Sequence, residues 1–169
     1  MKKLNKKGFT LIELLAVIVI LAILVAVAVP AVTRYLNTAR KGTYADNAQA
    51  AISVVRNDVI SQFGAANGRK YYLNGSCSDT TLTTEATCTS AGKVWTVGIN
   101  DLLEKKLKNS PYGSLYDEDS YVEVIAATDG SGSYTYNICL VDESSEKYGI
   151  KQSEDAVNEA NVVTGVSCS

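Results

Sequence analysis

The sequence of 169 residues contains no histidine, and this absence limits the chemistry that it can perform. Histidine is the commonest nitrogen ligand of protein-bound metals and a frequent general base. The sequence also has no G-x-S-x-G motif, no phosphate-binding glycine-rich loop and no pair of carboxylates on a rigid element. The acidic residues 117–119 lack the glycine and the spacing of a calcium loop, which favours a solvated turn. We therefore expect a protein that is not an enzyme, without catalytic residues, cofactor or metal site.

Basic residues are scarce in most of the chain. Sixteen Lys and Arg stand against 18 Asp and Glu, and four of the lysines, at positions 2, 3, 6 and 7, precede Gly8. The remainder therefore carries 12 − 18 = −6. An acidic surface without a basic stripe argues against nucleic-acid binding by the monomer.

A long apolar run follows the N-terminal lysines. Glu13 is the only ionisable residue between Gly8 and Arg34, and residues 11–29 form a stretch of 19, close to the roughly 20 residues that span a bilayer. Basic residues before such a run predict a membrane-inserted N-terminus with its lysines on the cytoplasmic side. A cleaved secretory signal is an alternative, but the run is too long and no suitable cleavage site follows it. Pro30 predicts a kink or local melting.

An amphipathic pattern continues the helix beyond Pro30. Its apolar positions step by three or four residues: Ala45, Ala48, Ile52, Val55, Val59 and Phe63. Gly64 and the pair Asn67-Gly68 then indicate a stop. One helix from about Phe9 to about Ala66 would be roughly 85 Å long at 1.5 Å per residue. A small soluble domain cannot bury such a rod, so half of it must lie in a membrane or in an assembly.

The last hundred residues predict a small antiparallel domain, which gives an α+β fold class. Residues 74–92 read as a loop closed by cysteines, and 93–97 have strand character. Residues 101–108 predict a short helix capped by Asn100. Alternation predicts a hairpin of residues 121–126 and 134–141 around a turn at 129–132. A second short helix, residues 154–160, is expected in the polar tail with Ser153 as its cap.

All four cysteines lie after the apolar run: Cys77, Cys88, Cys139 and Cys168. Behind a membrane-targeted N-terminus, they predict two disulfides in an oxidising exterior. Four cysteines allow three pairings, and proximity in the sequence favours 77–88 and 139–168. The second of these would tie the tail back onto the sheet.

The N-terminus, Lys6-Lys7-Gly8-Phe9-Thr10-Leu11-Ile12-Glu13 followed by the apolar run and Pro30, resembles the type IV pilin family. The resemblance covers the first thirty residues closely and the amphipathic continuation only in style. It implies cleavage by a prepilin peptidase after Gly8 and N-methylation of the new N-terminus, Phe9. Pro30 matches the family's helix-breaking proline. A second proline common further along that helix is missing, and Gly42 is expected to supply flexibility instead.

Glu13 matches the carboxylate of this family. The resemblance implies that in a filament it neutralises the Phe9 amine of a neighbouring subunit and sets the axial register. The alternative is a carboxylate near the lipid headgroups at a helix N-terminus, where negative charge is favourable. On spacing alone the two interpretations are nearly even, and the Lys-Gly-Phe junction favours the first.

Four segments follow from this interpretation: a cleaved leader (1–8), a transmembrane and filament-core segment (9–30), an amphipathic continuation (31–66) and a sheet domain (67–169). The expected partners are identical subunits, the prepilin peptidase and N-methyltransferase, an inner assembly platform and, before assembly, the membrane. The expected location is the cell membrane and then an extracellular pilus.

Within this group we expect a major pilin, with roles in adhesion, motility or DNA uptake implied by the resemblance. The alternatives are a pseudopilin of a type II secretion or competence system, and a single-pass anchored surface domain that never polymerises.

Overall fold

The computed structural model describes residues 9–62, 64, 65 and 67–169. The chain forms two compact units, residues 1–39 and 40–169, and we call the second unit the head. The predicted leader (1–8), including Gly8, and the stripe position Phe63 lie outside the described residues.

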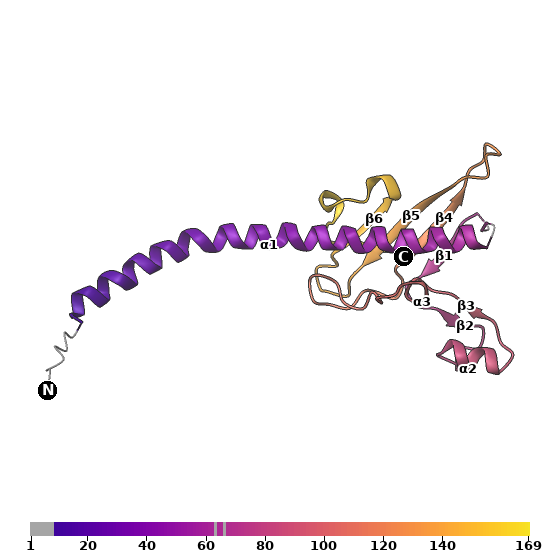
Figure 1. Ribbon diagram of the computed structural model, residues 1–169, viewed down its shortest axis with the longest axis horizontal. Coiled ribbons are helices and arrows are strands. Elements are labelled where there is room, and N and C mark those ends of the chain that lie inside the picture. Colours follow the sequence, from indigo (N-terminus) through magenta and orange to yellow (C-terminus); the bar gives the residue numbers. More distant parts are fainter. Residues whose placement is uncertain (1–8, 63, 66) are drawn as a thin grey trace, which may run out of the picture. The chain divides into compact units, whose positions relative to one another are not determined.

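The long helix α1 spans Leu11–Ser61 and passes through both units (Figure 1). The predicted local melting at Pro30 is wrong, because this residue lies inside the helix without interruption. A proline removes one helical hydrogen bond, whereas melting in an apolar stretch would leave several backbone groups unsatisfied. The helix is therefore continuous on both sides of Pro30.

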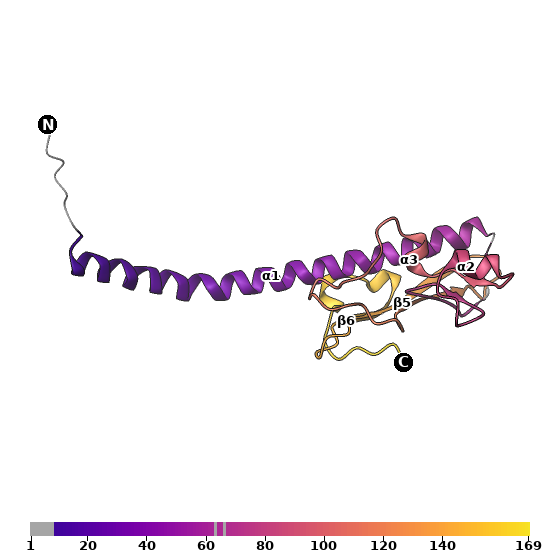
Figure 2. The same cartoon turned by 90° about the horizontal axis from the view of Figure 1, so that it is seen from below.

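In the second unit, α1 contributes the helical layer of the core. Its buried side chains include three alanines, which let the helix backbone approach its neighbours closely: Tyr44, Ala45, Ala48, Ala51, Ile52, Val55 and Val59. These confirm the described part of the predicted stripe and add Tyr44 and Ala51 to it. Seen from below, this part of α1 lies on one side of the sheet (Figure 2). The facing core residues are strand side chains such as Tyr71, Val124 and Ile138.

The sheet has four antiparallel strands in the order β1-β4-β5-β6. Their bounds are β1 Arg69–Tyr72, β4 Tyr121–Ala126, β5 Tyr134–Val141 and β6 Gly149–Ser153. The central pair, β4 and β5, is the predicted hairpin, with Val122 opposite Ile138. The two outer strands were not predicted, since each is short and gains its pairing only from a central strand.

Residues 76–96 form a separate small lobe, which spans the segment predicted to be a loop (74–92) and part of the strand predicted at 93–97. It contains β2 (Ser76–Cys77), β3 (Trp95–Thr96) and the helix α2 (Glu85–Ser90). The two strands pair with each other, and the Cys77–Cys88 disulfide joins β2 to α2. The Thr84 side chain accepts a hydrogen bond from the Thr87 N–H and so caps α2.

The predicted helix at 101–108 is wrong. The structure has one helical turn, α3 (Ile99–Leu102), and Asn100 lies within it rather than at its cap. The Asn100 amide instead donates to the Leu107 carbonyl oxygen at 3.2 Å and accepts from the Leu107 N–H at 2.7 Å. Because the side chain satisfies this backbone, residues 103–108 follow an irregular path with Leu107 buried.

The predicted tail helix at 154–160 is also wrong. Two short 3-10 turns occupy this part, η1 (Glu154–Ala156) and η2 (Glu159–Asn161), and the Ser153 side chain makes no capping bond. The Asn158 side chain accepts from the Ala160 N–H at 3.0 Å and starts the second turn. Asparagine side chains commonly compete with a continuing helix in this way.

The end of the chain is fastened to the sheet by the Cys139–Cys168 disulfide. Cys139 neighbours the core residues Ile138 and Leu140 in β5, so alternation places it nearer the face opposite α1. The Lys151 ammonium of β6 also donates to the Ser167 carbonyl oxygen at 3.0 Å. The result is the expected α+β architecture, with α1 on one face of the sheet and a disulfide-tied tail.

Candidate functional site

The first turn of α1 is closed by a reciprocal pair of side chains, Thr10 and Glu13. The Thr10 N–H and hydroxyl donate to Glu13 Oε2 at 2.8 and 2.7 Å, and the Glu13 N–H donates to Thr10 Oγ1 at 3.3 Å. This is a capping box, in which two unsatisfied backbone donors at the helix start are paired by side chains. It explains why the helix begins at Leu11, directly after Phe9-Thr10.

The capping box also fixes the position of the carboxylate. Glu13 is exposed, and both bonds from Thr10 end on Oε2, so in the described structure Oε1 has no protein donor. Phe9, with 85% of its surface exposed, stands at the same end of the helix. The arrangement therefore presents a carboxylate oxygen one helical turn from the residue at which the resemblance predicts a new amine.

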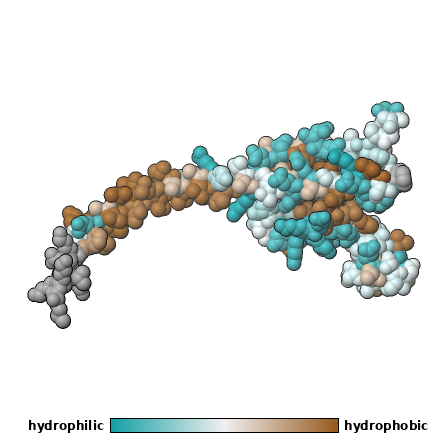
Figure 3. All heavy atoms as spheres, viewed as in Figure 1, coloured by the Kyte–Doolittle hydropathy of each residue, from teal (hydrophilic) through white to brown (hydrophobic). Residues whose placement is uncertain are grey.

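The surface of α1 between Glu13 and Thr33 is apolar on all sides. Its large apolar side chains are 47–83% exposed between Leu11 and Leu36, with Tyr35 the only aromatic among them. Most of the surface of this helix is brown in Figure 3, with teal atoms near its N-terminal end. By length and composition this helix can cross a membrane. A helix that is apolar all round needs lipid or other such helices as its surroundings.

The helix continues through Pro30 although one carbonyl loses its donor there. Because proline has no N–H, the orphaned carbonyl is that of Ala26, four residues earlier. The Thr33 hydroxyl donates to the carbonyl oxygens of Val29 and Pro30, each at 3.1 Å, and so satisfies this side chain within the apolar stretch. No charged side chain follows Glu13 until Arg34. Apolar side chains therefore surround the helical backbone along this whole stretch.

Residues 3–29 match the family model of the prokaryotic N-terminal methylation motif. This N-terminus fits a type IV pilin or pseudopilin. The motif together with the long apolar helix supports a pilin-like or pseudopilin precursor, a class of structural proteins rather than an enzyme family. Comparison with curated proteins and with solved structures gives no match.

The structure describes three of the four residues predicted to act in processing and assembly. Phe9, Glu13 and Pro30 lie at or within the exposed part of α1, whereas Gly8 is outside the described residues. The roles of all four in cleavage, methylation and assembly stay predictions. Thr10 was missed, although the pattern Thr-x-x-Glu before an apolar run is the sequence signature of a capping box.

The two disulfides have the pairing that proximity in the sequence favours. Cys77 is bonded to Cys88 with Cα atoms 5.8 Å apart, and Cys139 to Cys168 with Cα atoms 5.6 Å apart. Both values lie in the usual range for disulfides. The first disulfide cross-links the small lobe, and the second ties the C-terminal tail to β5.

The acidic residues of the head are engaged locally. In the part of the chain that the structure describes, no group of three or more His, Cys, Asp or Glu residues could hold a metal ion. Asp117 accepts from the Asp119 N–H at 3.0 Å and from the Lys147 ammonium at 3.2 Å. These contacts fit the solvated turn expected at 117–119.

Buried tyrosines stiffen the head beneath α1. The Tyr44 hydroxyl donates to the carbonyl oxygens of Leu140 at 3.2 Å and Tyr148 at 3.0 Å. The Tyr116 ring packs edge-on against Tyr44, with ring centroids 5.3 Å apart. Burial raises the pKa of Tyr44 above its ordinary value and raises the pKa of Tyr116 to about 12. The helix is therefore fastened to β5 and to the β5–β6 connection by hydrogen bonds that require neutral phenols.

Proposed function

We propose that this chain is a structural subunit, specifically a major pilin, of a type IV pilus. A prepilin peptidase cuts it after Gly8, and the Phe9 amine is then methylated. The mature chain leaves the membrane and polymerises through α1 into a cell-surface filament that serves adhesion, motility or DNA uptake. Its direct partners are identical subunits, the processing enzyme and an inner assembly platform.

The observation that carries this proposal is the apolar helix surface with a single carboxylate at its start. The methylation motif covers that same stretch, residues 3–29. An all-apolar helix is stable in lipid before assembly and in a bundle of identical helices afterwards. The same surface therefore supports both states of a subunit that moves from a bilayer into a filament.

The Thr10–Glu13 capping box supplies a physical route to subunit register. Cleavage after Gly8 would create a positive amine at Phe9, and methylation leaves it charged. A carboxylate among apolar helices needs a cationic partner, and Glu13 Oε1 remains open to one in the described structure. The Phe9 amine of a neighbouring subunit is such a partner, and its docking sets the axial position of one helix against the next.

The head favours a pilin over the smaller subunits of the same group. It has about 100 residues after α1, with two disulfides, the second of which closes the C-terminal tail. Glu13 is retained, as in shaft-forming subunits of the family that the sequence resembles. Both features support the major pilin over a short competence pseudopilin.

The proposal is tested with variants that separate the charge of Glu13 from its capping role. Glu13→Gln keeps an oxygen acceptor for Thr10 but removes the charge, whereas Thr10→Val removes the cap and keeps the charge. We expect Glu13→Gln to lower the amount of sheared surface filament at least roughly tenfold, since an uncharged side chain cannot hold the amine. Thr10→Val should retain filaments, because a lost cap weakens only the first helical turn.

Filament amounts are measured by electron microscopy and immunoblotting of sheared cells, against the membrane pool of the same protein. Normal piliation of Glu13→Gln and Glu13→Leu would contradict the pairing of Glu13 with the amine. A wild-type chain that stays in the membrane and forms no filament would contradict the pilin assignment itself.

A further inference from the structure

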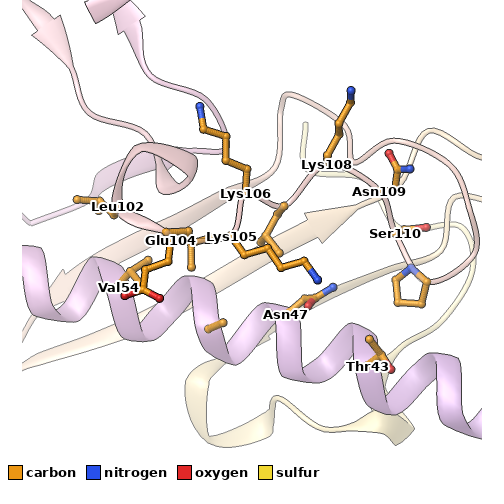
Figure 4. Close-up of a pocket in the computed structure, with 14 residues that line it drawn as sticks. Thr43, Asn47, Val54, Leu102, Glu104, Lys105, Lys106, Lys108, Asn109 and Ser110 are labelled. Carbon is orange, nitrogen blue, oxygen red and sulfur yellow. The ribbon is translucent and has the colours of Figure 1, made fainter.

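A groove runs along one flank of α1 in the head. It has a volume of about 890 Å³ and lies between α1 and residues 102–111 (Figure 4). Ala50 and Val54 of α1 and Leu102 and Leu103 of the loop give it an apolar lining. The groove belongs entirely to the second unit, so its shape is set by the fold of the head.

The rim of this groove carries three lysines and one carboxylate, that of Glu104, so its net charge is positive. Lys105, Lys106 and Lys108 are all exposed, because the buried Leu107 is held inward by the Asn100 amide. Figure 4 shows Lys106 and Lys108 pointing away from α1. We call residues 105–108 the lysine rim.

The opposite flank of α1 is acidic. A hollow of about 320 Å³ there is lined by Gln49, Ser53 and Arg56 of α1 and by Glu154 and Asp155 of η1, and Arg56 is paired with Glu154. At 100° per residue, Gln49 and Ser53 lie on the other side of the buried stripe from Val54. Asp155 and Glu159 are exposed, and the exposed Ala160 and Val163 follow them in the chain. We call residues 154–159 the acidic flank.

Within the part of the chain that the structure describes, the lysine rim and the outer carboxylates of the acidic flank have no ion-pair partners. Among the described residues the ion pairs join Arg56 with Glu154 and Lys147 with Asp117. The lysine rim concentrates three positive charges in four residues of a chain whose remainder after Gly8 carries −6. A repeating, head-to-tail contact between identical subunits joins two different patches of the chain, and opposite charges on opposite flanks of one helix make two such patches complementary.

We propose that the lysine rim of one subunit docks on the acidic flank of a second copy of this chain, with Asp155 and Glu159 facing the lysines. This inference rests on the proposed filament, in which α1 of every subunit points into the bundle and its two flanks face lateral neighbours. The apolar lining of the groove receives the small apolar side chains beside the carboxylates. The contact is heterologous, so it repeats along the assembly without closing.

Charge reversal tests this contact in the full-length chain. Lys105→Glu with Lys106→Glu should lower the surface filament at least roughly tenfold while leaving the membrane pool of processed protein unchanged, since like charges then face each other. Asp155→Lys with Glu159→Lys should do the same alone and should restore filaments when combined with the first pair. The matched control, Lys70→Glu with Lys93→Glu, changes the net charge equally on exposed lysines outside both flanks and should assemble normally.

Cross-linking tests the contact directly. Lys106→Cys combined with Asp155→Cys should give a ladder of disulfide-linked subunits in oxidised filaments, and neither single variant should form the ladder. Filaments without a ladder, or normal filaments from both charge-reversed pairs, would overturn the docking and leave the proposed function standing. Reduced DNA retention by otherwise normal filaments of the lysine variant would also overturn it. A wild-type chain that forms no filaments would overturn both.

Discussion

Asn100→Ala should be one of the most damaging single substitutions in the head, although the side chain is uncharged. Asn100 is 6% exposed and binds both backbone groups of Leu107, with a further bond to Asn74 Oδ1 at 2.9 Å. Truncation leaves the Leu107 N–H and carbonyl without these partners in a buried site. Each unsatisfied group costs about 1–3 kcal/mol, so the expected loss in the free energy of unfolding for the two groups is about 2–6 kcal/mol.

The loop can escape part of this cost only by letting water reach Leu107. That movement gives up burial of the leucine side chain, which itself stabilises by about 1.5–3 kcal/mol. It also displaces the lysine rim on either side of Leu107. The same substitution should therefore reduce filament yield as well as stability.

The assay is urea unfolding of the full-length chain in detergent with its disulfides intact, followed by near-ultraviolet circular dichroism of the tyrosines. Asn109→Ala is the matched control, since Asn109 lies on the same loop and is exposed. We expect the control to stay within about 0.5 kcal/mol of the wild type, as surface substitutions usually do. Equal stabilities of the two variants would show that Asn100 does not hold the loop.

Two further predictions concern the two disulfides and the buried tyrosines. Replacing Cys139 and Cys168 by serine should lower the free energy of unfolding by about 3.6 kcal/mol, from the chain entropy of a loop with a sequence separation of 29. Replacing Cys77 and Cys88, with a sequence separation of 11, should lower it by about 2.8 kcal/mol. The latter loss should appear mainly as proteolysis within residues 78–94, and a larger effect on global unfolding from Cys77 and Cys88 would contradict this. The free energy of unfolding should also fall as pH rises from about 10, the unfolded pKa of tyrosine, toward about 12, the folded pKa of Tyr71 and Tyr116. Tyr116→Phe should make that fall shallower, and an unchanged slope would refute the role of its burial.

Much of the fold follows from periodicity in the sequence. The apolar run and the stripe at 45–59 predict α1, and alternation predicts the β4–β5 hairpin, because each pattern matches a long element with one consistent environment. The strands β1 and β6 were missed since Arg69–Tyr72 and Gly149–Ser153 are short and become strands only by pairing with the centre of the sheet. Asn100 was assigned as a cap because local sequence does not reveal that Leu107, seven residues later, uses its side chain.

The candidate site shows the same division. The spacing in the sequence from the N-terminal lysines to Glu13 and on to Pro30 indicates a pilin-like N-terminus. The match of residues 3–29 to the methylation motif supports the same interpretation. The geometry of Glu13 depends on Thr10, whose signal was present in the sequence as Thr-x-x-Glu. The opposite charges on the two flanks of α1 could not be predicted, because the lysine rim and the acidic flank are about fifty residues apart in sequence and are related only through the folded head.

The central claim, that this chain is a processed pilin-like precursor, is tested most directly by the mass of its N-terminal peptide. The protein is isolated from the surface of cells that produce it, digested and analysed by tandem mass spectrometry. The account predicts a chain that begins with N-methylated Phe9 and lacks residues 1–8. An intact Met1 would indicate a simple membrane anchor, and a start after Ala28 would indicate a secretory signal; either result would contradict the account.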